Sequence, residues 1–329
     1  MKDPTTAQKT ATVVPTALPA DEGNPSEGLL GMSTPTNAGS TTLVSQTEPQ
    51  DSSGVCPAGM IHIEADYCPN QATRCLRETV EKNNHHHICH AFAPPVMCRS
   101  PAAKHLSFCM DRYEYPNQPG AHAVIHANWY DAASTCNSVG KRLCWESEWT
   151  AACEGPEHLP FPYGWERDPA SCNIGRPFDL PYLDRMYSKN PEVQRKELDR
   201  LDRSVRSGAM SKCVSGYGVH DLTGNVDEWV NNESREAGGL WAALKGGSYI
   251  QARNACRPKT TSHEPNFRFY TLGFRCCKDA APKDSPQPVA DIRPQSIISP
   301  MNGFRSPRVP DPVKDHWPEW QGRVLSLWE

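Results

Sequence analysis

The chain has 329 residues, with 34 basic and 38 acidic side chains that give a net charge of −4 at neutral pH. These charges are interspersed and leave no concentrated positive field for phosphates, so the sequence predicts no nucleic-acid partner. It also contains no apolar run long enough to span a bilayer, so no transmembrane segment is predicted.

Composition divides the chain into four parts. Residues 1–54 are dominated by Thr, Pro, Ala, Ser, Gly and Gln, and we expect a disordered tether there because no apolar cluster offsets the backbone entropy. Residues 55–105 form a predicted Cys-rich N-terminal arm, and residues 106–277 form the predicted main domain. Residues 278–329 are predicted to be a Pro-rich tail with sparse apolar residues.

All fourteen cysteines lie between Cys56 and Cys277, a density typical of disulfide-bonded domains or of metal clusters. The CxxC spacings of structural zinc sites are absent, so disulfides are the favoured interpretation. The residues after Met1 lack the apolar stretch of a signal peptide. Because disulfides form in oxidising compartments, we expect an extracytoplasmic protein: periplasmic, secreted or lipid-anchored. Its leader is not visible in this sequence, so we expect the leader to lie upstream or to have been removed.

The arm shows little periodicity apart from its cysteines, and its most unusual stretch is "HHHICH", from His85 to His90. Imidazoles in such a cluster are able to bind a soft metal. No second group of ligands lies nearby in the sequence, so a solvated polar loop is the favoured interpretation, and the role of His85, His86 and His87 stays open.

The main domain begins with "FCMDRYEYPN", which predicts a strand that enters a turn at Pro116. In the next stretch, "HAVIHAN", His122 and His126 have the spacing of two metal ligands on one helix turn. The β-branched residues Val124 and Ile125 between them favour a strand instead.

Two short helices are predicted next. One covers residues 128–138, with Asn128 as its N-cap and Gly140 as its stop. The other lies within residues 141–155 and ends before Gly155. The alternating charges of residues 190–206 predict a further, exposed helix. With short strands and frequent turn residues, the whole is predicted to be an irregular α+β domain.

A series of sequence blocks occurs in a fixed order along the main domain: "DRYEYPN", "WYDAASTC", "GKRLCWESEWTAAC", "FPYG", "CNIG", "GYGVHDLTGNVDEW", "KGGSY" and "LGFRCC". Together they resemble the formylglycine-generating enzyme family, also called the sulfatase-modifying factor family. The resemblance implies a single loop-rich α+β domain, related in topology to C-type lectins and braced by disulfides and calcium.

The resemblance implies a first calcium site in "DLTGNVDEW". Its ligands would be the side chains of Asp221 and Glu228 and the backbone carbonyls of Gly224 and Val226. Two carboxylates and two carbonyls suit calcium, a hard cation that prefers oxygen ligands.

A second calcium site would begin with the Asn173 side chain and the Ile174 carbonyl. The remaining family ligands of that site fall where this chain has its charged insertion, so they are unassigned.

The resemblance also implies a disulfide between Cys136 and Cys276. A second family disulfide begins at the position of Cys153, but Thr261 occupies the partner position. Cys153 is therefore expected to pair differently or to stay free.

Enzymes of this family oxidise a substrate cysteine to an aldehyde with O2, using copper(I) held by two thiolates five residues apart. Ser248 is retained, and Cys256 matches the second thiolate, so these are the candidate catalytic residues. Gln251 stands at the first thiolate position, and a carboxamide does not replace a thiolate for copper(I). The copper site is half missing, unless a distant cysteine or His263 supplies the second ligand.

Cysteine parity leaves two alternatives for Cys256. If it is a lone thiolate, at least one more cysteine is unpaired. If all fourteen cysteines pair, Cys256 belongs to a disulfide and no thiolate remains.

The resemblance favours a formylglycine-generating-type oxidoreductase, or a divergent member, acting on a peptide thiol. The alternative is a non-catalytic extracytoplasmic binding domain that kept the calcium-braced scaffold and lost the copper site. The iron-dependent sulfoxide synthase branch is disfavoured, because its iron site lies largely on a helical bundle that this chain lacks. A monomer with a peptide or protein ligand is expected.

Overall fold

The computed structural model describes residues 54–80, 87–233, 241–250 and 254–280. Most of the predicted tether and of the predicted tail therefore lies outside the described residues. The same holds for His85, His86 and Gln251.

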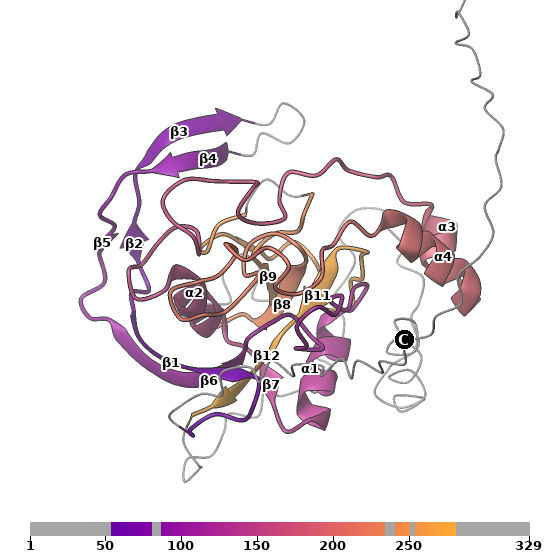
Figure 1. Cartoon of the computed structure of the whole chain (residues 1–329), viewed down its shortest axis with the longest axis horizontal. Coiled ribbons are helices and arrows are strands. Elements are labelled where there is room, and N and C mark those ends of the chain that lie inside the picture. Colours follow the sequence, from indigo (N-terminus) through magenta and orange to yellow (C-terminus); the bar gives the residue numbers. More distant parts are fainter. Residues whose placement is uncertain (1–53, 81–86, 234–240, 251–253, 281–329) are drawn as a thin grey trace, which may run out of the picture. The chain divides into compact units, whose positions relative to one another are not determined.

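Within the described residues the chain forms short strands and four helices (Figure 1). The strands are β1 (Met60–Tyr67), β2 (Gln71–Ala72), β3 (Cys75–Val80), β4 (His87–Phe92), β5 (Met97–Cys98), β6 (Lys104–Asp111), β7 (Arg142–Leu143), β8 (Asp227–Asn231), β9 (Ala242–Lys245), β10 (Lys259–Thr260), β11 (Leu272–Phe274) and β12 (Cys276–Asp279). The helices are α1 (Trp129–Ser138), α2 (Glu146–Glu154), α3 (Leu183–Met186) and α4 (Pro191–Leu201).

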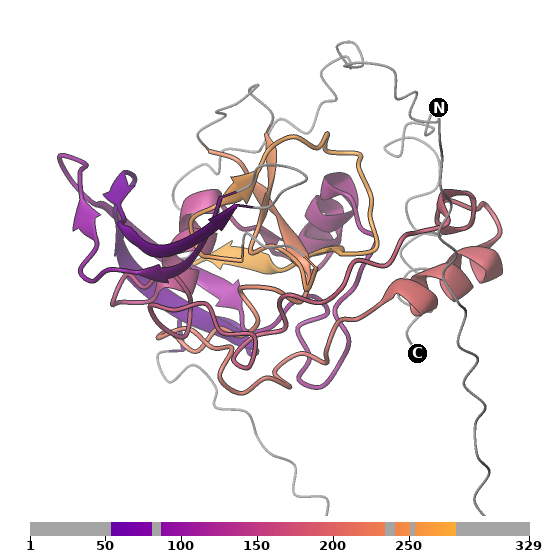
Figure 2. The ribbon, with the colours of Figure 1, turned by 90° about the horizontal axis from the view of Figure 1, so that it is seen from above.

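The strands make two four-stranded sheets and two small ribbons. One sheet has the order β1-β6-β12-β7 and is antiparallel, and the other has the order β10-β9-β8-β11, in which only β11 and β8 run parallel. The ribbons are β2-β5 and β3-β4, and Figure 2 shows the same strands from above. Long irregular segments join these elements, so the predicted loop-rich α+β class is confirmed, whereas calcium bracing stays a prediction.

The first strand of the predicted arm belongs to a main sheet. β1 pairs with β6 along its whole length, from Met60 opposite Asp111 to Tyr67 opposite Lys104. The predicted boundary at residue 105 therefore falls inside a pair of strands, and only the β2-β5 and β3-β4 ribbons project from the sheets.

Helix α1 begins at its predicted N-cap, and both α1 and α2 end where the predicted glycines follow them. The Asn128 side chain accepts a hydrogen bond from the Asp131 N–H at 2.8 Å, and the Asp131 carboxylate accepts one from the Asn128 N–H at 3.0 Å. This reciprocal pair satisfies two of the free N–H groups at the start of α1. Helix α2 stops at Gly155, whose φ of +66° suits glycine.

Two local predictions are wrong. The "HAVIHAN" segment contains no strand, because His126 has a φ of +60° that interrupts an extended backbone; Val124 and Ile125 are buried in an irregular segment instead. The predicted polar loop at the histidine cluster is strand β4 from His87 onward. Its pairing with β3 and a disulfide between Cys75 and Cys89 hold it extended.

Two of the four apolar clusters of the described core lie beneath helices α1 and α2. In one, side chains of β1 and β6 pack against α2, as Ile63 and Trp149 show. In the other, α1 packs against β8 and β11, with Trp129 and Trp229 buried at the contact. Helix α2 contacts strands of both sheets, and α1 contacts β7 of the first sheet as well as β8 of the second, so both helices bridge the two sheets.

The chain passes from one sheet to the other at Arg275, between β11 and β12. Its guanidinium is buried and binds both carboxylate oxygens of Glu228 on β8, at 2.7 and 2.8 Å. It also donates to the carbonyl oxygens of Asp111, at the end of β6, and of His220. One side chain therefore links the two sheets.

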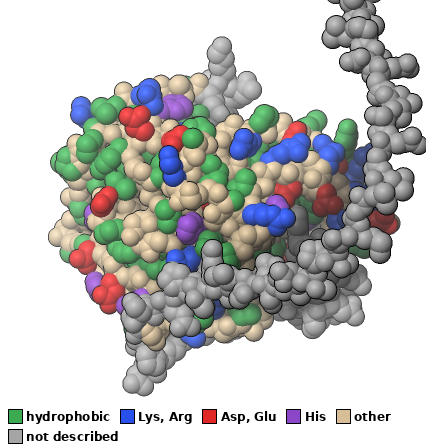
Figure 3. Space-filling view, in the orientation of Figure 1, with side chains coloured by type: hydrophobic (Ala, Val, Ile, Leu, Met, Phe, Trp, Pro, Cys, Tyr) green, Lys and Arg blue, Asp and Glu red, His purple; other side chains and the backbone are tan. Residues whose placement is uncertain are grey.

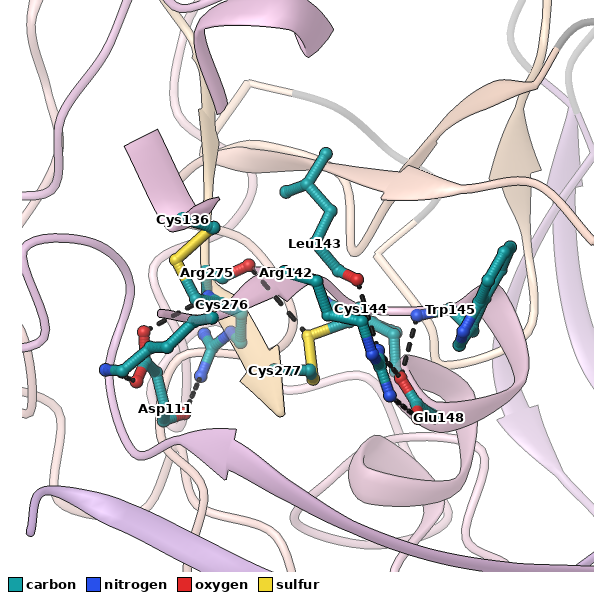
Figure 4. Close-up of a disulfide and its surroundings, with 12 residues drawn as sticks. Asp111, Cys136, Arg142, Leu143, Cys144, Trp145, Glu148, Arg275, Cys276 and Cys277 are labelled. Carbon is teal, nitrogen blue, oxygen red and sulfur yellow. Dashed lines mark hydrogen bonds and ion pairs between the residues drawn. A yellow bond between two sulfur atoms is a disulfide. The ribbon is translucent and has the colours of Figure 1, made fainter. Parts of the chain in front are cut away.

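Two disulfides fix β12 directly after this crossing (Figure 4). Cys276 is bonded to Cys136 on α1, and Cys277 to Cys144, which follows β7. Successive strand residues face opposite sides of a sheet, so the adjacent cysteines anchor β12 on both faces.

We predict that Arg275→Met lowers the free energy of unfolding by about 3–5 kcal/mol, because it leaves the buried Glu228 carboxylate without its cation. The measurement is urea unfolding with the disulfides intact. The control is Arg195→Met, which removes an exposed pair with Asp199 on α4 and should change stability by less than about 1 kcal/mol. Equal effects of the two substitutions would contradict a linking role for Arg275.

Candidate functional site

The segment after β9 turns sharply at two glycines before it reaches Ser248. Gly246 has a φ of +90° and Gly247 a φ of +64°. A Cβ at Gly246 would lie 2.6 Å from the Leu222 carbonyl oxygen, so only glycine fits this close approach. The turn positions the following segment over the end of α2.

Ser248 is fully buried, and its hydroxyl has no hydrogen-bond partner among the described residues. Its carbonyl oxygen accepts from the Asn254 amide at 2.9 Å, and the Asn254 oxygen accepts from Arg167 at 3.3 Å. Gln251 lies between them, outside the described residues.

Cys256 forms a disulfide with Cys153 on α2, with a sulfur–sulfur distance of 2.04 Å. Both residues are fully buried. The residues that follow them form an ion pair, in which Arg257 donates to Glu154 at 2.9 Å. Arg257 also donates to the Cys68 carbonyl at 2.9 Å, so this cross-link joins α2, the segment after Ser248 and the base of the arm.

The residues present do not fit copper(I). The sulfur of Cys256 is covalently bonded to Cys153, and a disulfide sulfur is not a thiolate ligand. All fourteen cysteines lie in the described part of the chain and all are paired. Among the described residues, no group of three His, Cys, Asp or Glu side chains converges as metal ligands, and His263 stacks on Phe267 with 4.1 Å between ring centroids.

The predicted calcium loop has an unusual backbone. Asp221, Gly224 and Asn225 all have positive φ, at +59°, +81° and +53°. A Cβ at Gly224 would overlap the Asn173 carbonyl oxygen and the Ile174 side chain. The Asn225 N–H donates to that same Asn173 oxygen at 2.9 Å, so the segments of both predicted calcium sites lie against each other.

Three buried carboxylates gather at this loop, and sequence reasoning missed one of them. Glu114 accepts from the Asn225 amide at 2.7 Å and from the Val226 N–H at 3.2 Å. Burial, followed by the charge of Asp221, raises the pKa of Glu114 well above its usual range. Burial also raises the pKa of Asp221 to about 6. Nothing in the sequence pointed to Glu114, because it stands in a strand-and-turn block far from the loop.

The first predicted calcium site is rich in oxygen donors, but its carboxylates do not converge as a ligand group among the described residues. Asp221, Glu228 and Glu114 outnumber the single guanidinium of Arg275 that faces them, and the Gly224 and Val226 carbonyls belong to the same loop. Asp221 uses one carboxylate oxygen to accept from the Gly208 N–H at 2.8 Å. Glu228 is more constrained, because both its oxygens accept from Arg275 and one also accepts from Trp149.

The second predicted calcium site is less suited to a cation. The Asn173 side-chain oxygen, which would be a ligand, accepts a hydrogen bond from Arg176 at 2.9 Å. The neighbouring Ile174 side chain packs against a disulfide between Cys172 and Cys213. Both calcium sites stay predictions.

The structure joins Cys136 to Cys276, as the resemblance implied. The other bonds are Cys56–Cys109, Cys68–Cys98, Cys75–Cys89, Cys144–Cys277, Cys153–Cys256 and Cys172–Cys213. Seven disulfides in one chain indicate an oxidising, extracytoplasmic environment. In the part of the chain that the structure describes, no helix has the length and apolarity to cross a membrane.

The chain is similar to known proteins that are named after formylglycine-generating enzymes. The chain is 28% identical over 179 residues to the formylglycine-generating enzyme of Mus musculus, covering 49% of this chain and 45% of that protein. It is 29% identical over 169 residues to the "Inactive C-alpha-formylglycine-generating enzyme 2" of Mus musculus, covering 49% and 51%. The chain thus spans about half the length of these relatives.

Among solved structures, the one titled "Crystal Structure of CarF" matches with a TM-score of 0.43 and 17% identity. That match covers 68% of this chain and 98% of CarF. The model of the sulfatase-modifying factor enzyme 1-like domain matches residues 72–280, which is more than half of the chain. The protein therefore belongs to the sulfatase-modifying factor family.

Proposed function

We propose that this protein is a non-catalytic, extracytoplasmic binding domain built on the family scaffold, rather than a formylglycine-generating-type oxidase. The bond between Cys153 and Cys256 carries the proposal. This bond oxidises Cys256, the single cysteine that matches a copper thiolate in the sequence, so its sulfur is not available as a thiolate.

The family chemistry needs two thiolates, because copper(I) bound by a sulfur pair is what admits the substrate sulfur as a third ligand. Here one position is Gln251 and the other is Cys256, whose sulfur is bonded and fully buried. Ser248 is retained, but a serine hydroxyl alone supplies neither a redox centre nor a site for a thiol substrate.

Relatives do not decide between the two functions. The chain is about equally identical to a protein named as a formylglycine-generating enzyme and to one named as inactive. Similar identity to both means that the site residues, rather than overall similarity, favour the non-catalytic alternative. A peptide or protein is the proposed ligand class, because the loop-rich scaffold offers long connecting segments as a recognition surface.

We further propose that calcium braces this scaffold at the first of the two sites. Asp221, Glu228 and the Gly224 and Val226 carbonyls would hold the ion. A bound divalent cation would offset the buried negative charge that Arg275 alone leaves in excess.

We predict that all fourteen cysteines of the protein are disulfide-bonded in solution. Alkylation of the full-length, unreduced protein in denaturant, followed by mass spectrometry, should label no cysteine, and the digest should contain a peptide that links Cys153 to Cys256. Titration with copper(I) against a competing chelator should give the same weak binding for this protein and for the double variant Cys153→Ser/Cys256→Ser. Alkylated Cys256, together with tight copper(I) binding that the double variant loses, would overturn the proposal.

We also predict that calcium stabilises the protein by binding at the first site. Calcium at about 100 times its dissociation constant should stabilise the protein by about 2.7 kcal/mol, measured as a rise in the thermal unfolding midpoint that a chelator reverses. Asp221→Asn should reduce this rise, because it removes one ligand charge while keeping an oxygen for the Gly208 N–H. The control, Asp199→Asn on the exposed α4, should respond to calcium as the unaltered protein does. An unchanged response of Asp221→Asn would exclude this site.

A further inference from the structure

The insertion around α3 and α4 exposes more apolar side chain than any comparable stretch of the described residues. Six of its large apolar residues are between 38% and 75% exposed: Phe178, Leu180, Tyr182, Leu183, Tyr187 and Val193. We call these six residues the α3–α4 surface. Five other large apolar residues of the described chain are exposed, and three of them lie on strands β3 and β5 of the arm. A concentration of this kind on a soluble domain indicates a binding surface.

The α3–α4 surface is held in place by the domain beneath it. Met186 of α3 is fully buried. The Tyr187 hydroxyl donates to the Arg268 carbonyl at 2.6 Å, and the Tyr182 N–H donates to the Glu197 carboxylate at 2.7 Å. The Phe178 ring lies 6.5 Å from that of Tyr270. These contacts hold the segment in place while each of the six apolar side chains keeps at least 38% of its surface exposed.

Basic charge accompanies the apolar residues, and Figure 3 shows Lys and Arg side chains beside apolar ones in the region where Figure 1 shows α3 and α4. Most charges on the two helices are paired within the helices, as Arg195 is with Asp199. Among the described residues, no carboxylate forms an ion pair with Arg185 or Lys189. Asp184 is also outside any described ion pair, so the unpaired charge of the surface is positive by one.

The sequence offers a matching segment in its own tail. Residues 317–328 read "WPEWQGRVLSLW". Trp320, Val324, Leu327 and Trp328 have the i, i+4, i+7, i+8 spacing that places apolar residues on one face of a helix. Residues 311–329 contain four acidic and two basic side chains, so their charge is opposite in sign to the unpaired charge of the surface.

The stretch of chain between the described domain and the segment 317–328 is long enough for the segment to reach the α3–α4 surface. Residues 281–316 separate the last described residue from Trp317, and 36 residues can extend to roughly 120 Å. A domain of this size has a radius of gyration of only about 17 Å. A segment tethered in this way is present at an effective concentration of about millimolar, which favours it over a second copy of the chain at ordinary protein concentrations.

We propose that the segment 317–328 binds the α3–α4 surface of the same chain, with its tryptophans against the exposed apolar side chains, and with Glu319 and the acidic residues that flank the segment toward Arg185 and Lys189. The bound segment removes both apolar groups from water, which neither achieves alone. This inference is independent of whether the protein is catalytic.

Lysine-directed cross-linking of the full-length protein tests the proposal. Lys314 lies next to the tail segment, and Lys189 and Lys196 lie at the α3–α4 surface. We expect cross-links between Lys314 and these two lysines. In a mixture of isotopically light and heavy protein, they should join peptides of the same isotopic form, which identifies them as intramolecular.

Leu180→Asp, at the most exposed residue of the surface, should reduce these cross-links about tenfold, because it removes a buried leucine contact and repels the acidic tail. Trp320→Asp/Trp328→Asp should have the same effect. The matched control is Leu76→Asp on β3, a leucine that is also more than half exposed but lies outside the surface, and it should leave the cross-links unchanged.

Three outcomes would overturn the proposal. Cross-links that join light to heavy peptides would assign the surface to a second copy. Cross-links that persist in Leu180→Asp would mean that the apolar surface does not hold the tail. The absence of any cross-link from Lys314 to Lys189 or Lys196 would leave the surface to an external partner.

Discussion

The ion pair between Arg275 and Glu228 is the interaction on which the arrangement of the two sheets depends. Arg275 occupies the crossing between β11 and β12, which belong to different sheets, and Glu228 lies on the strand beside β11. A buried guanidinium must have its donors satisfied. The carboxylate and the carbonyls of Asp111 and His220 do so from both sheets at once, which fixes one sheet against the other with few regular ladder hydrogen bonds.

The seven disulfides stabilise the same arrangement of two sheets. A domain with short strands gains little cooperative hydrogen bonding, so disulfides that limit the unfolded ensemble contribute a larger share of its stability. The bond between Cys153 and Cys256 has this structural character. It lies beside the Glu154–Arg257 ion pair, and the same arginine binds the Cys68 carbonyl of the arm. Cys256, which the resemblance assigns to a catalytic thiolate position, therefore connects α2, the segment after Ser248 and the arm.

Two kinds of feature could be predicted from the sequence. Helix ends depend on a few neighbouring residues, and family membership depends on blocks of residues in a fixed order. Asn128 and Gly155 set helix ends by capping, which depends on a few neighbouring residues, and the ordered blocks identified the family. The strand predicted at "HAVIHAN" was wrong because the buried His126 has a positive φ, a conformation that the alternation of residue types does not reveal. Glu114 was missed for a similar reason, since its contact with Asn225 spans more than a hundred residues. Parity of the cysteines allowed a bonded Cys256, but the choice of Cys153 as its partner needed the tertiary arrangement of α2.

In our proposal, this scaffold has kept its fold while the chemistry at Cys256 has been lost. The most direct measurement incubates the full-length protein with copper(I), O2 and a pool of cysteine-containing peptides, and captures any aldehyde product with a hydrazide for mass spectrometry. We expect no aldehyde above the level given by the Cys153→Ser/Cys256→Ser variant. Aldehyde formed by the unaltered protein and abolished in that variant would show that Cys256 is catalytic.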